Sequence, residues 1–314
     1  MILVSTVAWA ETPVLLPPPD TGPSYHLVGW ANTFMPGAGQ ALLGNYGTAA
    51  FQLGYEGTTF ALGYHLSSGS ILTLDGFISH KPTQRLRRTD EVDIEDQLYG
   101  DILQEFAIKA HMVNTFESYR IAAFRNGKSP AGIPAGIDDK PVLDLFLEPF
   151  NAKNLTNPYV YLPMTFIFFS TIADYVNQVS GGLAPLSRLT PYSNTLFGIN
   201  QGVVQPMGSG APEEMFYRGF VQNEAMAVVP SPYFAIPVST ALFTFSHAPG
   251  DGRPTAAVAG GYLGYLMYHN DGRLGPGIAL HFWADVMLGL EEILLNGKGQ
   301  RTTPPATFSV QVNY

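Results

Sequence analysis

The stretch Glu213-Glu214-Met215-Phe216-Tyr217-Arg218 places two adjacent carboxylates and an arginine in a C-terminal third that is otherwise nearly uncharged. Charged side chains among apolar neighbours are costly unless they are paired, hydrated or used for chemistry. On a helix, Glu214 lies one turn before Arg218, so these two can pair along one face. Glu213 points about 100° away from Glu214. The stretch therefore predicts a structural ion pair, Glu214 with Arg218, beside one available base, Glu213.

We expect the helix that carries this stretch to begin at Ser209-Gly210-Ala211-Pro212, because proline is well suited to the first helical position. Glu213 and Glu214 would then lie in the first turn, where the helix dipole favours negative charge. A capped surface helix with a salt bridge would have the same spacing. The apolar segments on either side favour a buried location instead.

Two histidines follow on apolar segments. His247 comes after the uncharged residues 232–246, with Phe243 one turn before it. His281 has Asp285 one turn after it, and a carboxylate at that spacing can orient an imidazole, raise its basicity or share a metal ion with it. A single histidine on an apolar helix is more often a core residue than a functional one, so neither segment is decisive alone.

The three segments together resemble the CAAX protease and bacteriocin-processing (CPBP) family. The resemblance covers residues 206–295 and includes Gly219 after the arginine and a spacing of about 30 residues between motifs. The motifs, in order, are Glu213-Glu214-x-x-x-Arg218, Phe243-x-x-x-His247 and His281-x-x-x-Asp285.

This resemblance implies an all-helical intramembrane peptidase. Glu213 would activate the attacking water, and His247 and His281 would place it or stabilise the oxyanion. Prenyl-protein endopeptidases of the family carry Asn where this chain has Asp285. Because an ionised carboxylate would repel an oxyanion, Asp285 is interpreted as orienting His281, as a metal ligand or as a protonated donor. Family members are discussed both as metalloproteases and as metal-independent glutamate peptidases, so a divalent metal such as Zn held by His247, His281 and Asp285 stays open.

Composition favours a membrane protein and argues against binding to nucleic acid. Charged residues make up only 13% of the 314 residues, against roughly a quarter in soluble domains. The net charge is −9, which disfavours nucleic acid as a partner. The chain has no cysteine, which excludes disulfides and thiolate chemistry.

Residues 80–150 differ from the rest, because they hold about half of the charged side chains. They predict a solvated extramembrane insertion with one long amphipathic helix over residues 90–124. Its expected apolar face consists of Ile94, Leu98, Ile102, Phe106, Ala110 and Val113.

The remaining segments complete a five-part organisation. Residues 35–40 and 44–47 look like breaks between helical pieces, and residues 159–173 are apolar enough for a membrane helix. Residues 1–10 resemble the end of an export signal or an apolar tail. The expected regions are 1–26, an apolar start and Pro-rich linker; 27–79, an apolar helical region; 80–150, the charged insertion; 151–297, the CPBP-like peptidase bundle; and 298–314, an irregular tail.

We therefore expect an all-α polytopic membrane bundle with a polar, partly helical insertion, integral to the bacterial inner (plasma) membrane. Its expected function is hydrolysis of a peptide bond in a membrane-associated protein or peptide by glutamate-activated water. The catalytic residues would be Glu213, His247, His281 and Asp285, with Glu214 and Arg218 in support. Its partners would be that substrate and the lipid bilayer, and not nucleic acid. The alternative is a non-catalytic membrane binding or bacteriocin-immunity-like protein with a buried polar network.

Overall fold

The computed structural model describes residues 22–68, 91–128, 133–180, 191–247 and 252–297. These residues form helices and no strand, which confirms the all-α prediction for them. The elements, in chain order, are α1 (Tyr25–Phe34), α2 (Ala38–Leu42), α3 (Tyr46–Ser68), α5 (Glu91–Arg125), α6 (Val142–Leu147), the 3-10 turn η2 (Glu148–Phe150), α7 (Ala152–Leu155), α8 (Pro158–Ser180), α9 (Pro191–Ile199), the π-helical η3 (Asn200–Val204), α10 (Gln205–Glu213), the π-helical η4 (Glu214–Gln222), α11 (Asn223–Val228), α12 (Pro232–Phe245), α13 (Gly252–His269) and α14 (Gly275–Gly297).

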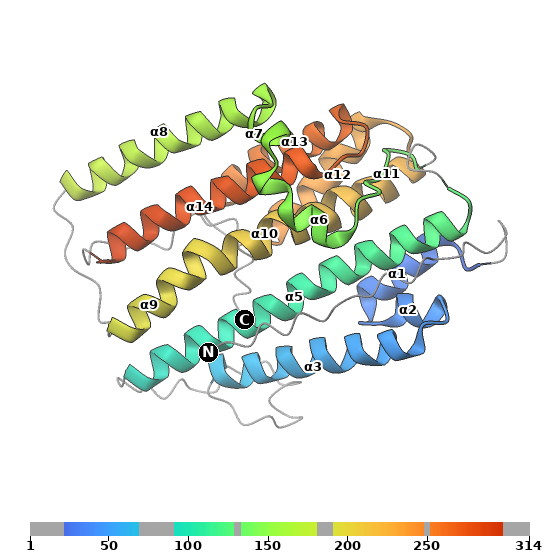
Figure 1. The fold of residues 1–314 in the computed structure, drawn as a ribbon, viewed down its shortest axis with the longest axis horizontal. Helices are drawn as coiled ribbons and strands as arrows, with labels where there is room; N and C mark the ends of the chain where they lie inside the picture. The colour runs from blue at the N-terminus through green and yellow to red at the C-terminus, as the bar shows by residue number, and fades with distance from the viewer. Residues whose placement is uncertain (1–21, 69–90, 129–132, 181–190, 248–251, 298–314) are drawn as a thin grey trace.

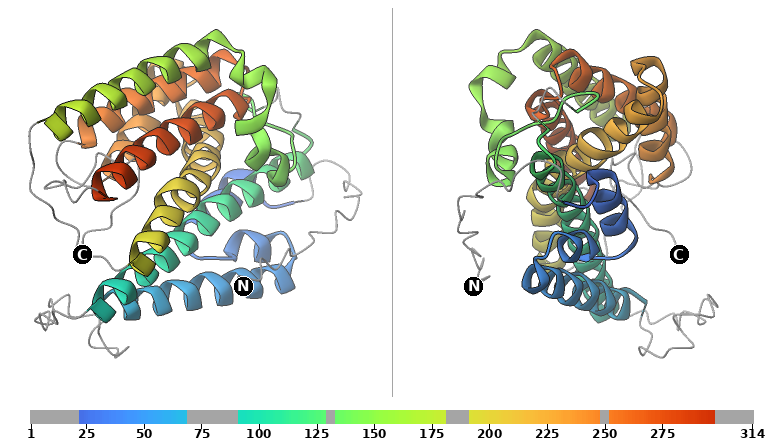
Figure 2. Two further views of the ribbon diagram at one scale, coloured as in Figure 1. Left: turned by 60° about the vertical axis from the view of Figure 1, so that its left-hand side comes forward. Right: turned by 90° about the vertical axis from the view of Figure 1, so that its right-hand side faces the viewer.

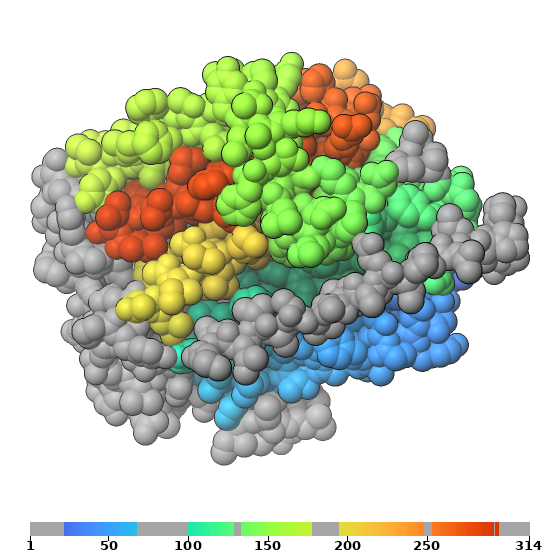
Figure 3. Space-filling view, in the orientation of Figure 1, coloured from blue at the N-terminus to red at the C-terminus, as the bar shows by residue number. Residues whose placement is uncertain are grey.

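The long helices stack side by side in a row. Figure 1 shows the order α3, α5, α9–α10, α14, α8, and neighbours in this order contact one another. α12 packs against α13 and η4, on the side of the row opposite α6 and α7 (Figure 2). In the space-filling view, α9 and α10 surface as a narrow band between α5 and α14 (Figure 3). α10 and η4 are therefore central to the bundle.

The central helix runs without interruption from α9 to α11, so the predicted helix start at residues 209–212 is wrong. Pro212 lies inside α10, and the wider π-helical turns of η4 begin at Glu214. Proline has no N–H to donate to the preceding turn, and a wider turn is one way in which a helix accommodates such a defect. Glu213 and Glu214 consequently lie in mid-helix, where the dipole of a first turn does not act on them.

α5 is a core helix rather than a solvated one, and its predicted apolar face coincides only in part with the buried face, since Val113 packs against the core. Phe106, from the expected apolar face, is 46% exposed. The buried side of α5 instead includes Gln104, Lys109, Phe116 and Tyr119. Some buried positions of α5 carry polar residues, because these residues bind polar partners on other helices. The buried face therefore does not show the spacing of apolar residues that is typical of an amphipathic helix. The expectation of a solvated helix is therefore wrong for α5.

The two breaks predicted near the N-terminus are present, since α1, α2 and α3 are separate helices. Buried polar contacts attach these helices to α5. Glu56 of α3 accepts from Asn114 at 2.5 Å and lies 2.8 Å from Nδ1 of His111, whose Nε2 is 3.1 Å from the carbonyl of Thr33. The formally charged Glu56 thus faces α5 and not the surroundings of the bundle.

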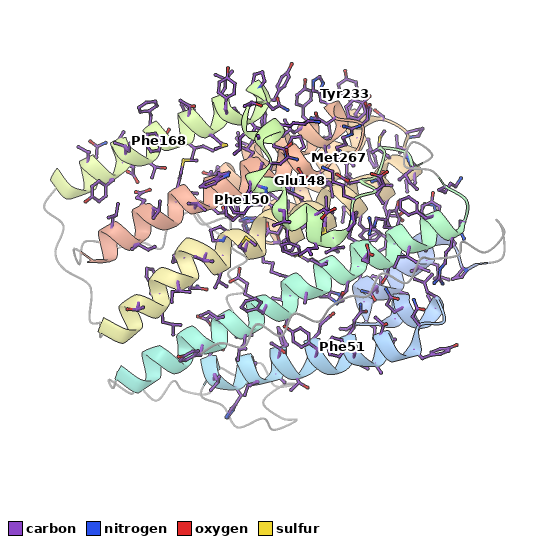
Figure 4. The ribbon with its side chains drawn as sticks, viewed as in Figure 1. Phe51, Glu148, Phe150, Phe168, Tyr233 and Met267 are labelled. Atoms are coloured by element: carbon purple, nitrogen blue, oxygen red, sulfur yellow. The ribbon has the colours of Figure 1, made fainter. Side chains whose placement is uncertain are left out.

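The connection between α5 and α8 fixes the start of α14. A carboxylate oxygen of Asp138 accepts from the backbone N–H of Leu274 at 3.0 Å, and the indole of Trp283 donates to the carbonyl of Pro149 at 2.9 Å. Glu148, labelled in Figure 4, is buried in the same region. These bonds set the position of α14, which carries His281.

α8 contains the candidate membrane span of the described residues, over Pro158–Asn177. Its apolar side chains are largely exposed on the bundle, and Phe168 is labelled among them in Figure 4. α12 is also apolar but shorter. The other described helices do not pass the same test of length and hydropathy. The predicted membrane helix over 159–173 therefore lies within this candidate.

Two glycines allow α3 and α5 to cross closely, and this contact yields a stability prediction. A methyl group at Gly100 would lie 2.6 Å from the carbonyl oxygen of Gly63 and 2.7 Å from Cβ of Ser67. We expect Gly100→Ala to destabilise the folded protein by about 1–3 kcal/mol through overpacking. Thermal unfolding of the detergent-solubilised protein measures this effect.

Gly57→Ala on α3 is the matched control, because a methyl group there meets no atom of the described residues within 4 Å. It should leave stability unchanged or raise it by about 0.5–1 kcal/mol through helix propensity. Equal unfolding temperatures for both variants would contradict the close crossing of α3 and α5.

Candidate active site

The structure brings Glu213, His281 and Asp285 together in the interior. Nε2 of His281 lies 3.9 Å from Oε2 of Glu213 and 3.7 Å from Oδ2 of Asp285. Glu213 is 0% exposed, and His281 and Asp285 are buried as well. His247 is also buried, and the ring of Phe243 contacts both histidines, with centroid distances of 4.5 Å to His247 and 5.8 Å to His281. The predicted residues thus come from α10, α12, α14 and the residues just after α12.

The expected ion pair between Glu214 and Arg218 is present, with Nη1 of Arg218 3.2 Å from Oε1 of Glu214. The arginine is fully buried. Its Nη2 donates to the carbonyl of Gly260 at 3.2 Å, and its guanidinium lies 4.3 Å from the ring centroid of Phe243. The cation is therefore compensated by a carboxylate, a carbonyl dipole and an aromatic face.

Glu214, and not Asp285, makes the hydrogen bond that orients His281. Nδ1 of His281 lies 2.9 Å from Oε1 of Glu214. Asp285 lies beside the other ring nitrogen at 3.7 Å, a distance typical of an ion pair but long for a hydrogen bond. Because a carboxylate paired with arginine accepts, Nδ1 carries a proton, and the neutral tautomer compatible with this bond has its Nε2 lone pair toward Glu213.

His247 is held in the same tautomer by the backbone. Its Nδ1 lies 2.7 Å from the carbonyl oxygen of Phe243, which can only accept. The neutral ring therefore donates through Nδ1 and carries its lone pair on Nε2. Phe243 fixes this histidine twice, by its carbonyl and by its ring.

Sequence reasoning missed Lys109 and Glu105, which reach the site from α5. Lys109 forms an ion pair with Oε1 of Glu213, and only 4% of its side chain is exposed. Glu105, one turn earlier, accepts from the side-chain amide of Gln205 on α10. No local signal distinguishes Lys109, because the partner is 104 residues away and the surrounding segment is rich in charge. Glu213, expected to be an available base beside the Glu214–Arg218 pair, is therefore paired with Lys109.

Metal binding gains no support from the positions of these side chains. Across the described ranges, no group of three or more His, Asp or Glu side chains is placed to hold a metal ion. His247, His281 and Asp285 do not form such a set.

Arg218 provides a test of the buried network. Arg218→Met leaves the carboxylate of Glu214 buried without its cation, so we expect a loss of about 3–5 kcal/mol in unfolding free energy. The double variant Arg218→Met/Glu214→Gln removes the uncompensated charge and should recover part of that loss. Denaturant unfolding in detergent measures both. A single variant as stable as the wild type would contradict this account of the pair.

Comparison with protein-family models matches residues 194–287 to type II CAAX prenyl endopeptidase Rce1-like proteins. The matched range contains Glu213, His247, His281 and Asp285, and it lies almost wholly within the range of the CPBP resemblance. Neither curated proteins nor solved structures gave a match. Residues 194–287 therefore match an Rce1-like domain of the CPBP family, a family of membrane-embedded peptidases.

Proposed function

We propose that this protein is an intramembrane endopeptidase in which Glu213 acts as the general base. The observation that carries the proposal is the buried pair of Glu213 and His281, with Oε2 and Nε2 separated by 3.9 Å. This distance is too long for a direct hydrogen bond. A single water oxygen can lie within hydrogen-bonding distance of both atoms.

The two side chains suit complementary roles toward that water. The Nε2 lone pair of neutral His281 accepts one hydrogen, while Oε2 of Glu213 accepts the other and removes it as the oxygen attacks the peptide carbonyl. Glu213 then returns the proton to the nitrogen of the leaving amine as the C–N bond breaks. Positioned proton transfer of this kind contributes typically about 10²–10⁴-fold to a rate.

His247 and Asp285 have supporting roles in this proposal. His247 and His281 both pack against the ring of Phe243, which places His247 beside the proposed catalytic pair. With its Nδ1 proton bonded to the carbonyl of Phe243, neutral His247 has a lone pair on Nε2 that can accept from the attacking water and help to place it. Asp285 acts electrostatically on the Nε2 side of His281, where an added positive charge on the ring would be stabilised.

We further propose that several helices of the bundle lie in the bilayer and that the substrate is a membrane-associated protein or peptide. The apolar exposed face of α8 supports this, as does the apolar character of α12, whose Phe245 is exposed. Within the hydrocarbon core of a membrane, a cluster of polar side chains is stable only where the helices shield it from lipid. The buried cluster around Glu213 meets that condition.

Glu213→Gln is the direct test. We expect cleavage to fall by about 10²–10⁴-fold, because the amide cannot take a proton from water. The wild type and the variant are reconstituted in liposomes with a set of membrane-associated peptides, and new termini are detected by mass spectrometry. Glu117→Gln on α5, which removes a partly exposed carboxylate, is the control and should remain active.

The rival hypothesis is a non-catalytic binding or immunity protein. It predicts no cleavage by the wild type and unchanged ligand binding in His247→Ala. Full activity in Glu213→Gln would contradict the proposed mechanism, even if the protein is a peptidase.

A further inference from the structure

We propose that Lys109 of α5 is a positioning residue for the catalytic base Glu213, supplied by a helix outside the region matched by the family model. The inference rests on the proposed function, because it assigns Lys109 a role toward the base of that reaction. α5 ends at Arg125, whereas the match begins at residue 194. The active site would therefore be incomplete without the N-terminal part of the chain.

The two carboxylate oxygens of Glu213 have different neighbours. Nζ of Lys109 pairs with Oε1, while Oε2 is the oxygen that lies 3.9 Å from His281. An ammonium on Oε1 restricts rotation of the carboxylate about its terminal bond. The same oxygen, Oε2, is thereby kept toward His281, where the proposed water would bind.

Lys109 also compensates buried negative charge. Four carboxyl groups approach one another here, those of Glu105, Glu213, Glu214 and Asp285. Arg218 is committed to Glu214 and to the carbonyl of Gly260. Lys109 is the remaining Lys or Arg ion-paired with this cluster among the described residues. A buried carboxylate without such a partner is strongly disfavoured.

The lysine is itself held in place by its neighbours. Glu105 lies one turn before it on α5 and is bonded to Gln205 of α10, which ties the two helices together beside the ion pair. Gly208 of α10 faces the lysine, because a methyl group there would lie 3.6 Å from Cγ of Lys109. The aliphatic stem of the lysine therefore runs along α10 on its way to Glu213.

The test compares Lys109→Met and Lys109→Arg in the liposome cleavage assay, with Lys153→Met as the matched control, since Lys153 is exposed. Misplacement of a catalytic group by about 1 Å can cost about 100-fold in rate. We expect Lys109→Met to lower kcat by about that factor with KM unchanged. Lys109→Arg should recover part of kcat, and Lys153→Met should behave as the wild type.

Thermal unfolding provides a second readout, which holds even if Lys109→Met folds poorly. If Lys109 compensates the charge of Glu213, the double variant Lys109→Met/Glu213→Gln unfolds at a higher temperature than Lys109→Met alone. A double variant no more stable than the single one would overturn the inference. Wild-type kcat in Lys109→Met, or a change confined to KM, would also overturn it.

The two proposals fail in different ways. If Glu213→Gln is inactive while Lys109→Met retains wild-type kcat, the role of Lys109 is refuted and the proposed peptidase mechanism stands. If Glu213→Gln retains full activity, the mechanism itself fails, whatever the behaviour of Lys109→Met.

Discussion

The fold around the site depends on keeping a fully buried guanidinium, that of Arg218, compensated. Glu214 supplies the opposite charge, Gly260 of α13 supplies a carbonyl, and Phe243 of α12 supplies an aromatic face. Three elements thus meet at one cation. Because an uncompensated buried charge costs several kcal/mol, the relative positions of η4, α12 and α13 are closely constrained. Glu214 also bonds to His281, which extends the constraint to α14.

Glu213, one residue earlier, is likewise a buried charge that needs an opposite charge, and its cation, Lys109, comes from α5. The two glutamates are neighbours in sequence, yet their ion-pair partners differ. Glu214 pairs with Arg218 and bonds to Nδ1 of His281. Glu213 pairs with Lys109 through one oxygen, and its other oxygen lies near Nε2 of His281. Adjacent helical residues point about 100° apart, and this divergence separates a structural carboxylate from a chemical one. The ion pair of Lys109 with Glu213 therefore joins the expected insertion, residues 80–150, to the expected peptidase bundle, residues 151–297.

The motif spacings predicted the local pairs well. The one-turn spacing of Glu214 and Arg218 gave an ion pair, and the same spacing brought Phe243 against His247. The start of the central helix was predicted wrongly, since Pro212 looked like a first-turn residue but lies inside α10, followed by a π-helical segment. The buried face of α5 was predicted only in part. Periodicity assumes that buried positions are apolar, and Lys109 and Gln104 are buried with polar partners.

The sequence by itself determined the helical class, the family resemblance and the motif residues of the candidate site, Glu213, His247, His281 and Asp285, because each depends on composition or on spacing within one or two turns. The tertiary structure alone decided which groups meet across the bundle. Glu214 rather than Asp285 bonds to His281, and Lys109 neutralises Glu213 over 104 residues of sequence. Such pairings follow from how helices pack, and nothing in the local sequence of either partner specifies the other.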